Sequence, residues 1–175
     1  MTVPPTEPPT TPEPTTTSTT TTSTTTTTLA PTTTLPLQSA WQIIQDEPRL
    51  DDLESLLNEC NSTALPIIST LSDPNETLTF FAPNNQAIRD AGIDVTSCPG
   101  GGEAVIARHL LEDQALDEVQ LATMTELTMS SGETVDIVAS GDTVDTIGGA
   151  QIVDPDLEAS NGYVHVVDAL LMPAP

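Results

Sequence analysis

The segment that follows Asn161-Gly162 constrains the fold of this chain more than any other. It reads Tyr-Val-His-Val-Val-Asp-Ala-Leu-Leu. Its large apolar residues fall on both faces of an extended strand, with Val164, Val166 and Leu170 on one face and Val167 and Leu171 on the other. Such a strand needs cover on both faces, so we expect it in the middle of a packed sheet. Asn161-Gly162 predicts a hairpin turn before it, because both residue types accept a positive φ.

An earlier segment, from Thr77 to Ile88, predicts a strand that runs into a helix. Its first residues alternate, with Leu78, Phe80 and Ala82 opposite Thr77, Thr79 and Phe81. Pro83 then ends the strand, and the side chain of Asn84 is suited to cap a helix that continues to Asp90.

Helical periodicity dominates the chain before and just after this strand. Ser39 and Gln42 have the spacing of a capping box, which predicts a short helix that ends before Pro48. Asp51 is predicted to cap the next helix. That helix has one buried face, formed by Leu53, Leu56, Leu57 and Cys60.

Two further helices are expected at residues 63–71 and 103–111, and the apolar period then changes from helical to alternating. Val135, Ile137 and Ala139 point to one face of a strand, and the residues between them point to the other. Turn residues at Gly132, Gly141 and Gly148-Gly149 separate the strands. Helices first and a run of mainly antiparallel strands afterwards indicate an α+β fold.

Residues 1–36 differ from the rest of the chain, because they are mostly Thr and Pro with only two charges, Glu7 and Glu13. Such a segment buries too little apolar surface to offset the entropy of ordering it, so we expect a disordered tail. Its composition is typical of O-glycosylated, mucin-like stalks, and an unmodified flexible linker is the alternative. Residues 37–175 hold all the predicted elements and form one domain.

The chain has a formal net charge of −23, with 26 acidic residues against three arginines and no lysine. This charge repels nucleic acids and anionic membranes, and it favours cationic or cation-bridged partners. Because the acids are spread along the chain, we favour a general role of the acidity in solubility over a dedicated cation site. No apolar stretch is long enough to span a membrane.

The two strand segments, together with the central Ala107-Arg108-His109-Leu110-Leu111, resemble the signatures of the fasciclin-like domain family. The resemblance covers nearly all of residues 38–173. It implies a wedge of β-strands with helices packed around it, and an extracellular adhesion and interaction module that is not an enzyme. The matching signature residues are Phe80, Pro83, Asn84, His109, Asn161, Gly162, His165 and Asp168. Arg108 stands where many members have Tyr, so the Tyr-His receptor motif attributed to some animal members is not carried over.

The cysteine count and the stalk-like tail favour one disulfide between Cys60 and Cys98 in an oxidising compartment, with two buried thiols as the alternative. Their spacing is similar to that of secreted, single-domain bacterial members of the family. We therefore expect the protein to be secreted or attached to the cell surface, although its first residues do not resemble a signal peptide.

No catalytic constellation, metal site or cofactor motif is predicted. His109 and His165 are expected to be hydrogen-bonded core residues and not metal ligands. Asp154, Asp156 and Glu158 alternate like the start of an EF-hand loop, but the pattern fails at the following positions. Asp168, within the closing strand, is expected to be a buried hydrogen-bond acceptor.

Asn61 and Asn75 each begin an Asn-x-Ser/Thr acceptor site for N-glycosylation, and Asn75 lies in a predicted turn.

The expected partner is a cell-surface or matrix protein or polysaccharide, bound by a monomer. A binding module for a small apolar ligand is the first alternative, for which a large apolar pocket would be needed. A hydrolase is the second, and it requires convergent titratable groups in a cleft.

Overall fold

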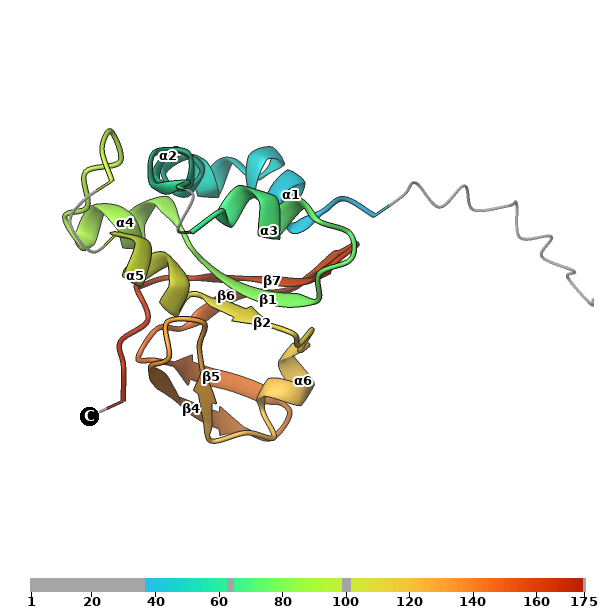
Figure 1. Cartoon of the computed structure of the whole chain (residues 1–175). Helices are drawn as coiled ribbons and strands as arrows, with labels where there is room; N and C mark the ends of the chain where they lie inside the picture. The colour runs from blue at the N-terminus through green and yellow to red at the C-terminus, as the bar shows by residue number, and fades with distance from the viewer. Residues whose placement is uncertain (1–36, 63–64, 99–101, 175) are drawn as a thin grey trace, which may run out of the picture. The chain divides into compact units, whose positions relative to one another are not determined.

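The computed structural model describes residues 37–62, 65–98 and 102–174, so the predicted stalk of residues 1–36 lies outside the described residues. Its helices are α1 (Ala40–Asp46), the short 3-10 helix η1 (Pro48–Leu50), α2 (Asp51–Cys60), α3 (Ile67–Ser72), α4 (Asn85–Asp90), α5 (Gly102–Arg108) and α6 (Glu118–Leu121) (Figure 1). Its strands are β1 (Leu78–Pro83), β2 (Leu110–Glu112), β3 (Glu126–Thr128), β4 (Thr134–Ser140), β5 (Thr143–Ile147), β6 (Ile152–Ala159) and β7 (Gly162–Val167).

The strands form two sheets. The first has the order β2-β1-β7-β6, and the second has the order β3-β4-β5. β7 pairs antiparallel with β6 but parallel with β1, and the other pairs of neighbouring strands are antiparallel. The predicted α+β class with mainly antiparallel strands is confirmed, and the closing strand lies inside its sheet as its two apolar faces require.

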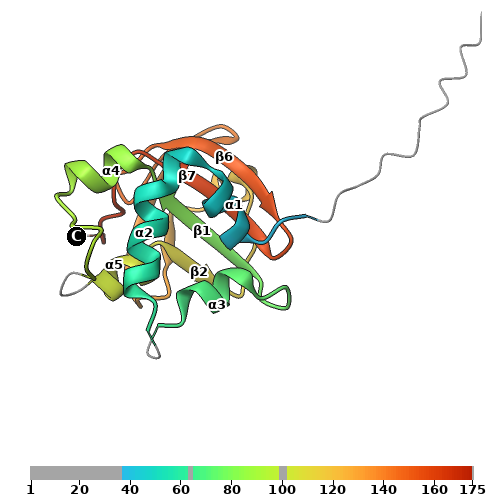
Figure 2. The same cartoon turned by 90° about the horizontal axis from the view of Figure 1, so that it is seen from above.

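The four-stranded sheet lies between two other layers. Helices α1 to α5 cover one of its faces, and the three-stranded sheet with α6 lies on the opposite side (Figures 1 and 2). Because neighbouring residues of a strand point to opposite faces, Phe80 packs under the helices and Phe81 packs toward the second sheet. In β7, Val166 packs under the helices and Val167 packs toward the second sheet, and both are fully buried.

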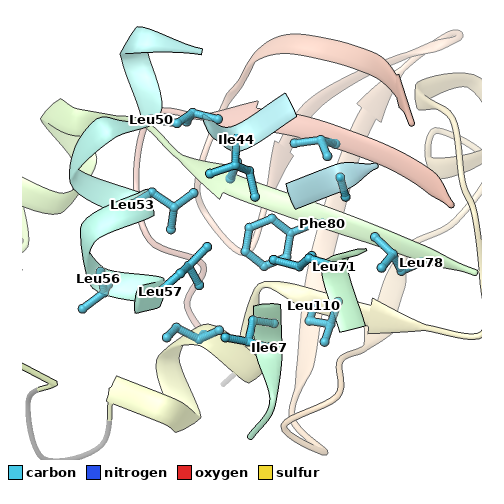
Figure 3. Packing of buried hydrophobic residues seen from close by; sticks show 14 of the residues in the cluster. Ile44, Leu50, Leu53, Leu56, Leu57, Ile67, Leu71, Leu78, Phe80 and Leu110 are labelled. Atoms are coloured by element: carbon cyan, nitrogen blue, oxygen red, sulfur yellow. The ribbon is translucent and has the colours of Figure 1, made fainter. Parts of the chain in front are cut away.

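The helical side of the core is built from aliphatic residues around one aromatic ring (Figure 3). Phe80 is surrounded there by leucines and isoleucines of the helices, among them Ile44, Leu53, Leu57 and Leu71. The predicted buried face of α2 is confirmed, because Leu53, Leu56, Leu57 and Cys60 all have exposed fractions of 2% or less.

The helix starts follow the predicted caps at two places and differ at a third. Ser39 and Gln42 form a capping box at α1, and Asn84 Oδ1 accepts a hydrogen bond from the amide of Ala87 at α4. The prediction that Asp51 caps α2 is wrong, because η1 runs directly into this helix and makes Asp51 its first residue. The side chain of Asn85 supplies the missing acceptor instead, 3.0 Å from the amide nitrogen of Asp52.

Two predicted helices are shorter in the structure. α3 begins at Ile67, after Pro66, and residues 63 and 64 lie outside the described residues. α5 ends at Arg108, and the Leu110-Leu111 pair predicted to be helical belongs to β2. The strand places Leu110 in the helical core and Leu111 in the core of the second sheet, so both leucines are buried on opposite faces.

Candidate functional site

His109 is buried at the end of α5, and both of its ring nitrogens are used inside the domain. Nε2 accepts a hydrogen bond from the amide of Leu171 at 3.1 Å, so Nδ1 carries the proton and donates to the carbonyl oxygen of Val105 at 2.8 Å. Burial lowers the pKa of His109 to about 4, and the nearby positive charge of Arg108 acts in the same direction. The ring is therefore neutral near pH 7 and ties α5 to the segment after β7.

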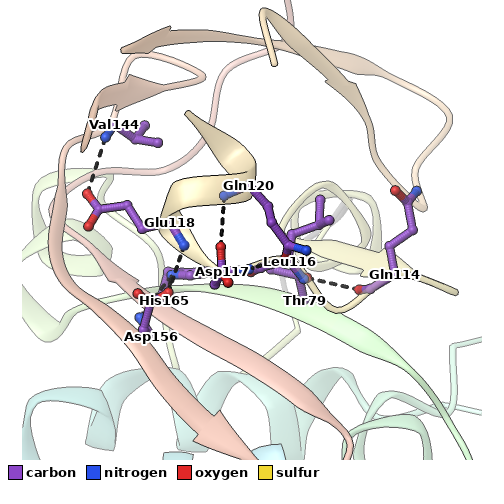
Figure 4. A network of polar contacts seen from close by, with 9 residues as sticks. All are labelled: Thr79, Gln114, Leu116, Asp117, Glu118, Gln120, Val144, Asp156 and His165. Carbon is purple, nitrogen blue, oxygen red and sulfur yellow. Dashed lines mark hydrogen bonds and ion pairs between the residues drawn. The ribbon is translucent and has the colours of Figure 1, made fainter. Parts of the chain in front are cut away.

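His165, on β7, is also buried with both ring nitrogens in use (Figure 4). Nδ1 accepts a hydrogen bond from the amide of Asp156 at 3.2 Å, and Nε2 donates to the carbonyl oxygen of Leu116 at 2.9 Å. The ring stacks on Phe81 with 5.4 Å between the ring centroids. Burial lowers the pKa of His165, against the opposing effects of the Leu116 carbonyl and the nearby carboxylates.

The contacts of His165 belong to a network that joins the two sheets (Figure 4). The hydroxyl oxygen of Thr79 accepts from the amide of Leu116 at 2.9 Å. The amide of Glu118 donates to Asp156 Oδ1 at 2.8 Å, and Glu118 Oε1 accepts from the amide of Val144 in β5 at 3.2 Å. The network holds α6 between β6 of the first sheet and β5 of the second, which gives its polar groups a structural role.

The candidate cation-binding residues do not converge in the described part of the chain. Asp154 pairs with Arg49 at 2.6 Å, whereas Asp156 adopts a left-handed backbone conformation with φ of 58° and accepts from Glu118. Among the described residues, no group of three His, Cys, Asp or Glu side chains is placed to hold a metal ion. With both histidines committed to backbone groups, these side chains offer neither a free general base nor a metal ligand.

Asn161 and Gly162 close the β6–β7 hairpin, but not in the way the sequence predicts. The paired residues are Ala159 and Gly162, and Asn161 does not have a positive φ. Gly162 has a φ of 141°, and a Cβ atom added to it would lie 1.7 Å from the carbonyl oxygen of Leu78. Glycine is required here because the backbone of β1 approaches so closely.

The side chain of Asn161 is buried and connects three separate segments. Its Oδ1 accepts from the amide of Ala40 at 2.9 Å, and its Nδ2 donates to the carbonyl oxygens of Leu71 at 3.1 Å and Asp73 at 3.2 Å. The hairpin turn is therefore fastened to the start of α1 and to the end of α3.

Asp168 differs from its predicted setting. It lies just after β7 and is exposed, whereas the sequence predicts a buried carboxylate within the strand. Its Oδ1 accepts from the amide of Gln151 at 2.8 Å, and its own amide donates to the carbonyl oxygen of Gln151 at 3.1 Å. It remains a hydrogen-bond acceptor, one that joins the end of β7 to the start of β6.

Cys60 and Cys98 are joined by a disulfide in the structure, with 4.8 Å between their Cα atoms. Cys60 is buried at the end of α2, and Cys98 is exposed in the loop before α5. The bond therefore ties this loop to the core.

Of the two N-glycosylation acceptor sites, the one at Asn75 is fully described. Asn75, Glu76 and Thr77 are all exposed, and Asn75 lies in the turn between α3 and β1. Asn61 is exposed as well, and its side-chain oxygen accepts from the amide of Ile68 at 3.3 Å. The third residue of that site, Thr63, lies outside the described residues.

All three arginines of the chain are paired with carboxylates. Arg49 contacts Glu47 and Asp154, Arg89 contacts Asp52, and Arg108 contacts Glu133 at 2.6 Å. Pairing with Arg108 lowers the pKa of Glu133. Because three cations face 26 acids, the surface keeps a large excess of negative charge.

Several grooves indent the described surface, and most carry charged side chains. One of about 380 Å3 includes Asp90 and Asp168, one of about 280 Å3 includes Asp46, Glu47 and Glu158, and one of about 360 Å3 includes Arg49 and Arg89. Another, of about 430 Å3, is here named the Trp41 groove and is lined by Ser39, Trp41, Gln42, Gln45, Ser72, Pro74 and Ser160.

No motif in the sequence points to the Trp41 groove. Its one available signal was the single tryptophan of the chain, placed on a short amphipathic helix. The partners of Trp41 come from distant segments, and only the folded chain brings them together.

The architecture defined by these elements is an α+β domain whose central sheet lies between a helical layer and a second sheet. A model of the Fasciclin domain matches residues 48–173 of the chain. The chain therefore belongs to the fasciclin domain family.

A solved structure shows the same fold. It is that of a FAS1 domain pair from the insect cell adhesion molecule fasciclin I, with a TM-score of 0.63 and 14% sequence identity. The match covers 78% of this chain and 51% of the other, so this chain spans about half the length of that domain pair. Among curated proteins, no relative matches the chain. No helix among the described residues is long and apolar enough to cross a membrane.

Proposed function

We propose that this protein is an extracellular, non-catalytic adhesion or matrix-interaction module carried on a Thr/Pro-rich stalk. The observation that carries the proposal is its membership of the fasciclin domain family over residues 48–173. The solved relative is part of a cell adhesion molecule, which supports the same role. A protein of this kind binds through its surface and needs no titratable centre.

The buried chemistry supports a non-catalytic role. Both histidines donate and accept hydrogen bonds within the domain, and burial keeps them neutral. Catalysis by a general base requires a group within hydrogen-bond reach of a substrate, and neither ring offers a free nitrogen. Neither histidine is therefore the general base that the rival hydrolase function would require.

The rival function as a carrier of an apolar ligand requires space between the helices and the sheet. The gap found there is lined by Leu53, Phe80, His109 and other core residues, and its volume is about 10 Å3. A cavity of this size holds at most a water molecule. An interaction at the surface is the better account.

Residues 1–36 act in this proposal as the stalk that holds the domain away from its attachment point. The low apolar content of the stalk gives it nothing to pack on the domain. Removing these residues is expected to leave the melting temperature nearly unchanged, and a drop of several degrees would show that they pack on the domain.

The acidic surface indicates a cationic or cation-bridged partner at the cell surface or in the matrix, bound by a monomer. Binding of the labelled full chain to its native cell surface is measured across a salt series. Affinity is expected to fall as salt rises, because charges are screened over about 10 Å at 0.1 M. Esterase and glycosidase substrates are assayed alongside, and robust turnover that one histidine or one carboxylate variant abolishes without unfolding would overturn the proposal.

A further inference from the structure

The Trp41 groove lies where three segments of the chain meet. α1 and its N-cap contribute Ser39, Trp41, Gln42 and Gln45, the end of α3 and the turn after it contribute Ser72 and Pro74, and the β6–β7 turn contributes Ser160. α1 packs against α3, β6 and β7, so these segments form one continuous surface.

Hydrogen bonds within the domain hold the segments that line this groove in place. The buried side chain of Asn161 accepts from the amide of Ala40 in α1 and donates to the carbonyl oxygens of Leu71 and Asp73 at the end of α3, so it joins the other two lining segments to the β6–β7 turn. The amide of Ser160 also donates to the carbonyl oxygen of Gln38 at 2.8 Å. A site whose lining segments are held in this way loses little conformational entropy on binding.

The lining of the Trp41 groove carries no formal charge, although the chain has a net charge of −23. Each of the three other open grooves described above includes two or three charged side chains. An uncharged lining of amides and hydroxyls suits a neutral ligand that both donates and accepts hydrogen bonds.

Three of the lining polar groups are available to such a ligand. Gln42 uses its side-chain oxygen to accept from the amide of Ser39 at 2.9 Å, and its amide nitrogen makes no hydrogen bond to another described residue. The hydroxyl of Ser160 likewise bonds to no described residue. Gln45 donates to Glu54 at 3.2 Å and keeps its side-chain oxygen as a further acceptor.

Trp41 gives the groove an aromatic surface. It is partly buried against the helical core and is also one of the residues that line the groove. The face of an indole ring is electron-rich, so it attracts the weakly positive C–H groups on the flat face of a sugar ring. A volume of about 430 Å3 lies within the range of about 300–1,000 Å3 that is usual for small-ligand sites.

We propose that the Trp41 groove binds a neutral saccharide unit of a surface or matrix glycan. Trp41 stacks on the sugar ring, and Gln42, Gln45 and Ser160 bond to its hydroxyl groups. The inference rests on the proposed function and names the class of partner for one part of the surface.

The single tryptophan makes the test specific to this groove. The full chain is produced in a host that attaches no N-linked glycans, because Asn75 follows Pro74 at the rim. It is titrated with mannotetraose, cellotetraose and chitotetraose while the fluorescence of Trp41 is recorded. At least one neutral oligosaccharide is expected to shift the emission saturably, and a sulfated oligosaccharide of the same length is expected to bind more weakly because of the net charge.

The variant Gln45→Met removes a polar group from the groove, and Gln86→Met on α4 is the matched control. Both glutamines are exposed and donate to a carboxylate, Gln45 to Glu54 and Gln86 to Asp90, so the substitutions disturb similar contacts. Gln45→Met and Ser160→Ala are each expected to weaken oligosaccharide binding about threefold to tenfold, which corresponds to the loss of one hydrogen bond. Gln86→Met is expected to bind as the unchanged protein does.

Three results would overturn the inference: no fluorescence change up to the solubility limit of every neutral oligosaccharide, a change that does not saturate, or equal weakening by Gln45→Met and Gln86→Met. Binding of the same proteins to the native surface separates the two proposals. Surface binding that persists without saccharide binding removes the glycan site and leaves the adhesion role intact. If the folded, unchanged protein binds neither the native surface nor any of the oligosaccharides, both proposals are wrong.

Discussion

The amide nitrogen of Ala40 donates a hydrogen bond to Oδ1 of Asn161, 2.9 Å away and 121 positions later in the chain. This contact joins the first helix of the domain to its last hairpin. The same side chain also bonds to two carbonyl oxygens at the end of α3. One buried side-chain amide thus satisfies three backbone groups, and its loss is expected to destabilise the helical layer.

Asn161→Ala is expected to lower the free energy of unfolding by about 2–4 kcal/mol, because it leaves buried backbone groups without partners. Urea unfolding followed by circular dichroism measures this change. Asn58→Ala on the exposed side of α2 is the control and is expected to change the free energy of unfolding by at most about 0.5 kcal/mol. Equal effects of the two substitutions would contradict the structural role of Asn161.

Gly162→Ala is expected to prevent folding or to destabilise the domain by more than about 3 kcal/mol, because its Cβ would overlap the carbonyl oxygen of Leu78. Gly141→Ala is a matched control. Gly141 has a φ of 69°, but a Cβ there meets nothing within 4 Å. The free energy of unfolding of this control is expected to fall by only about 1–2 kcal/mol, which is the cost of backbone strain in an L-residue at this φ. Similar melting temperatures for the two variants would show that β1 does not approach Gly162 so closely.

Val166→Asp is expected to unfold the domain, because Val166 is fully buried in the central strand and an aspartate there has no partner. Val138→Asp on β4 makes the same chemical change at a residue whose exposed fraction is 55%. That variant is expected to remain folded and soluble. A soluble, cooperatively unfolding Val166→Asp protein would place β7 at an exposed edge of its sheet.

Stability is expected to fall as the pH is lowered from 7 to 5. The folded-state pKa of His109, about 4, lies below the ordinary value of 6.5, so the unfolded chain takes up a proton before the folded domain does. The stabilisation is therefore complete above the unfolded pKa and is lost progressively as the pH falls toward 4. For His109 alone the loss between pH 7 and pH 5 is about 2 kcal/mol.

The pH effect of His109 is isolated by comparing the unchanged protein with His109→Asn. The asparagine does not titrate, so the variant is expected to lose less stability over the same interval, whatever its stability at pH 7. Urea midpoints at pH 7, 6 and 5 provide the comparison. Parallel pH profiles would mean that the pKa of His109 is not depressed by folding.

Reduction of the Cys60–Cys98 disulfide is expected to lower the free energy of unfolding by about 4 kcal/mol in the chain-entropy model, given the separation of 38 positions. Urea unfolding with and without reductant measures the change, and the double variant Cys60→Ala/Cys98→Ala, which is insensitive to reductant, is the control. Two thiols that react in the unfolded, unreduced protein would show that the bond is absent.

Local sequence determined several parts of the fold correctly because the relevant interactions are short in range. The capping box of Ser39 and Gln42 lies within one helical turn. The buried face of α2 follows from a repeat of three and four residues, which any helix places on one side. The two apolar faces of β7 likewise required a central position, and the structure provides it.

Tertiary structure alone decided the features that depend on partners distant in the chain. Leu110 and Leu111 have a helical neighbourhood in sequence, but pairing with β1 turns them into a strand that supplies two cores. The hairpin predicted at Asn161-Gly162 is present, but Asn161 does not adopt the positive φ on which that prediction rested. The importance of Asn161 lies in a side chain whose partners are 121, 90 and 88 positions away. The Trp41 groove exists only where those segments meet. Periodicity and capping reveal which face a residue presents, whereas contacts between distant segments depend on how all the faces pack at once.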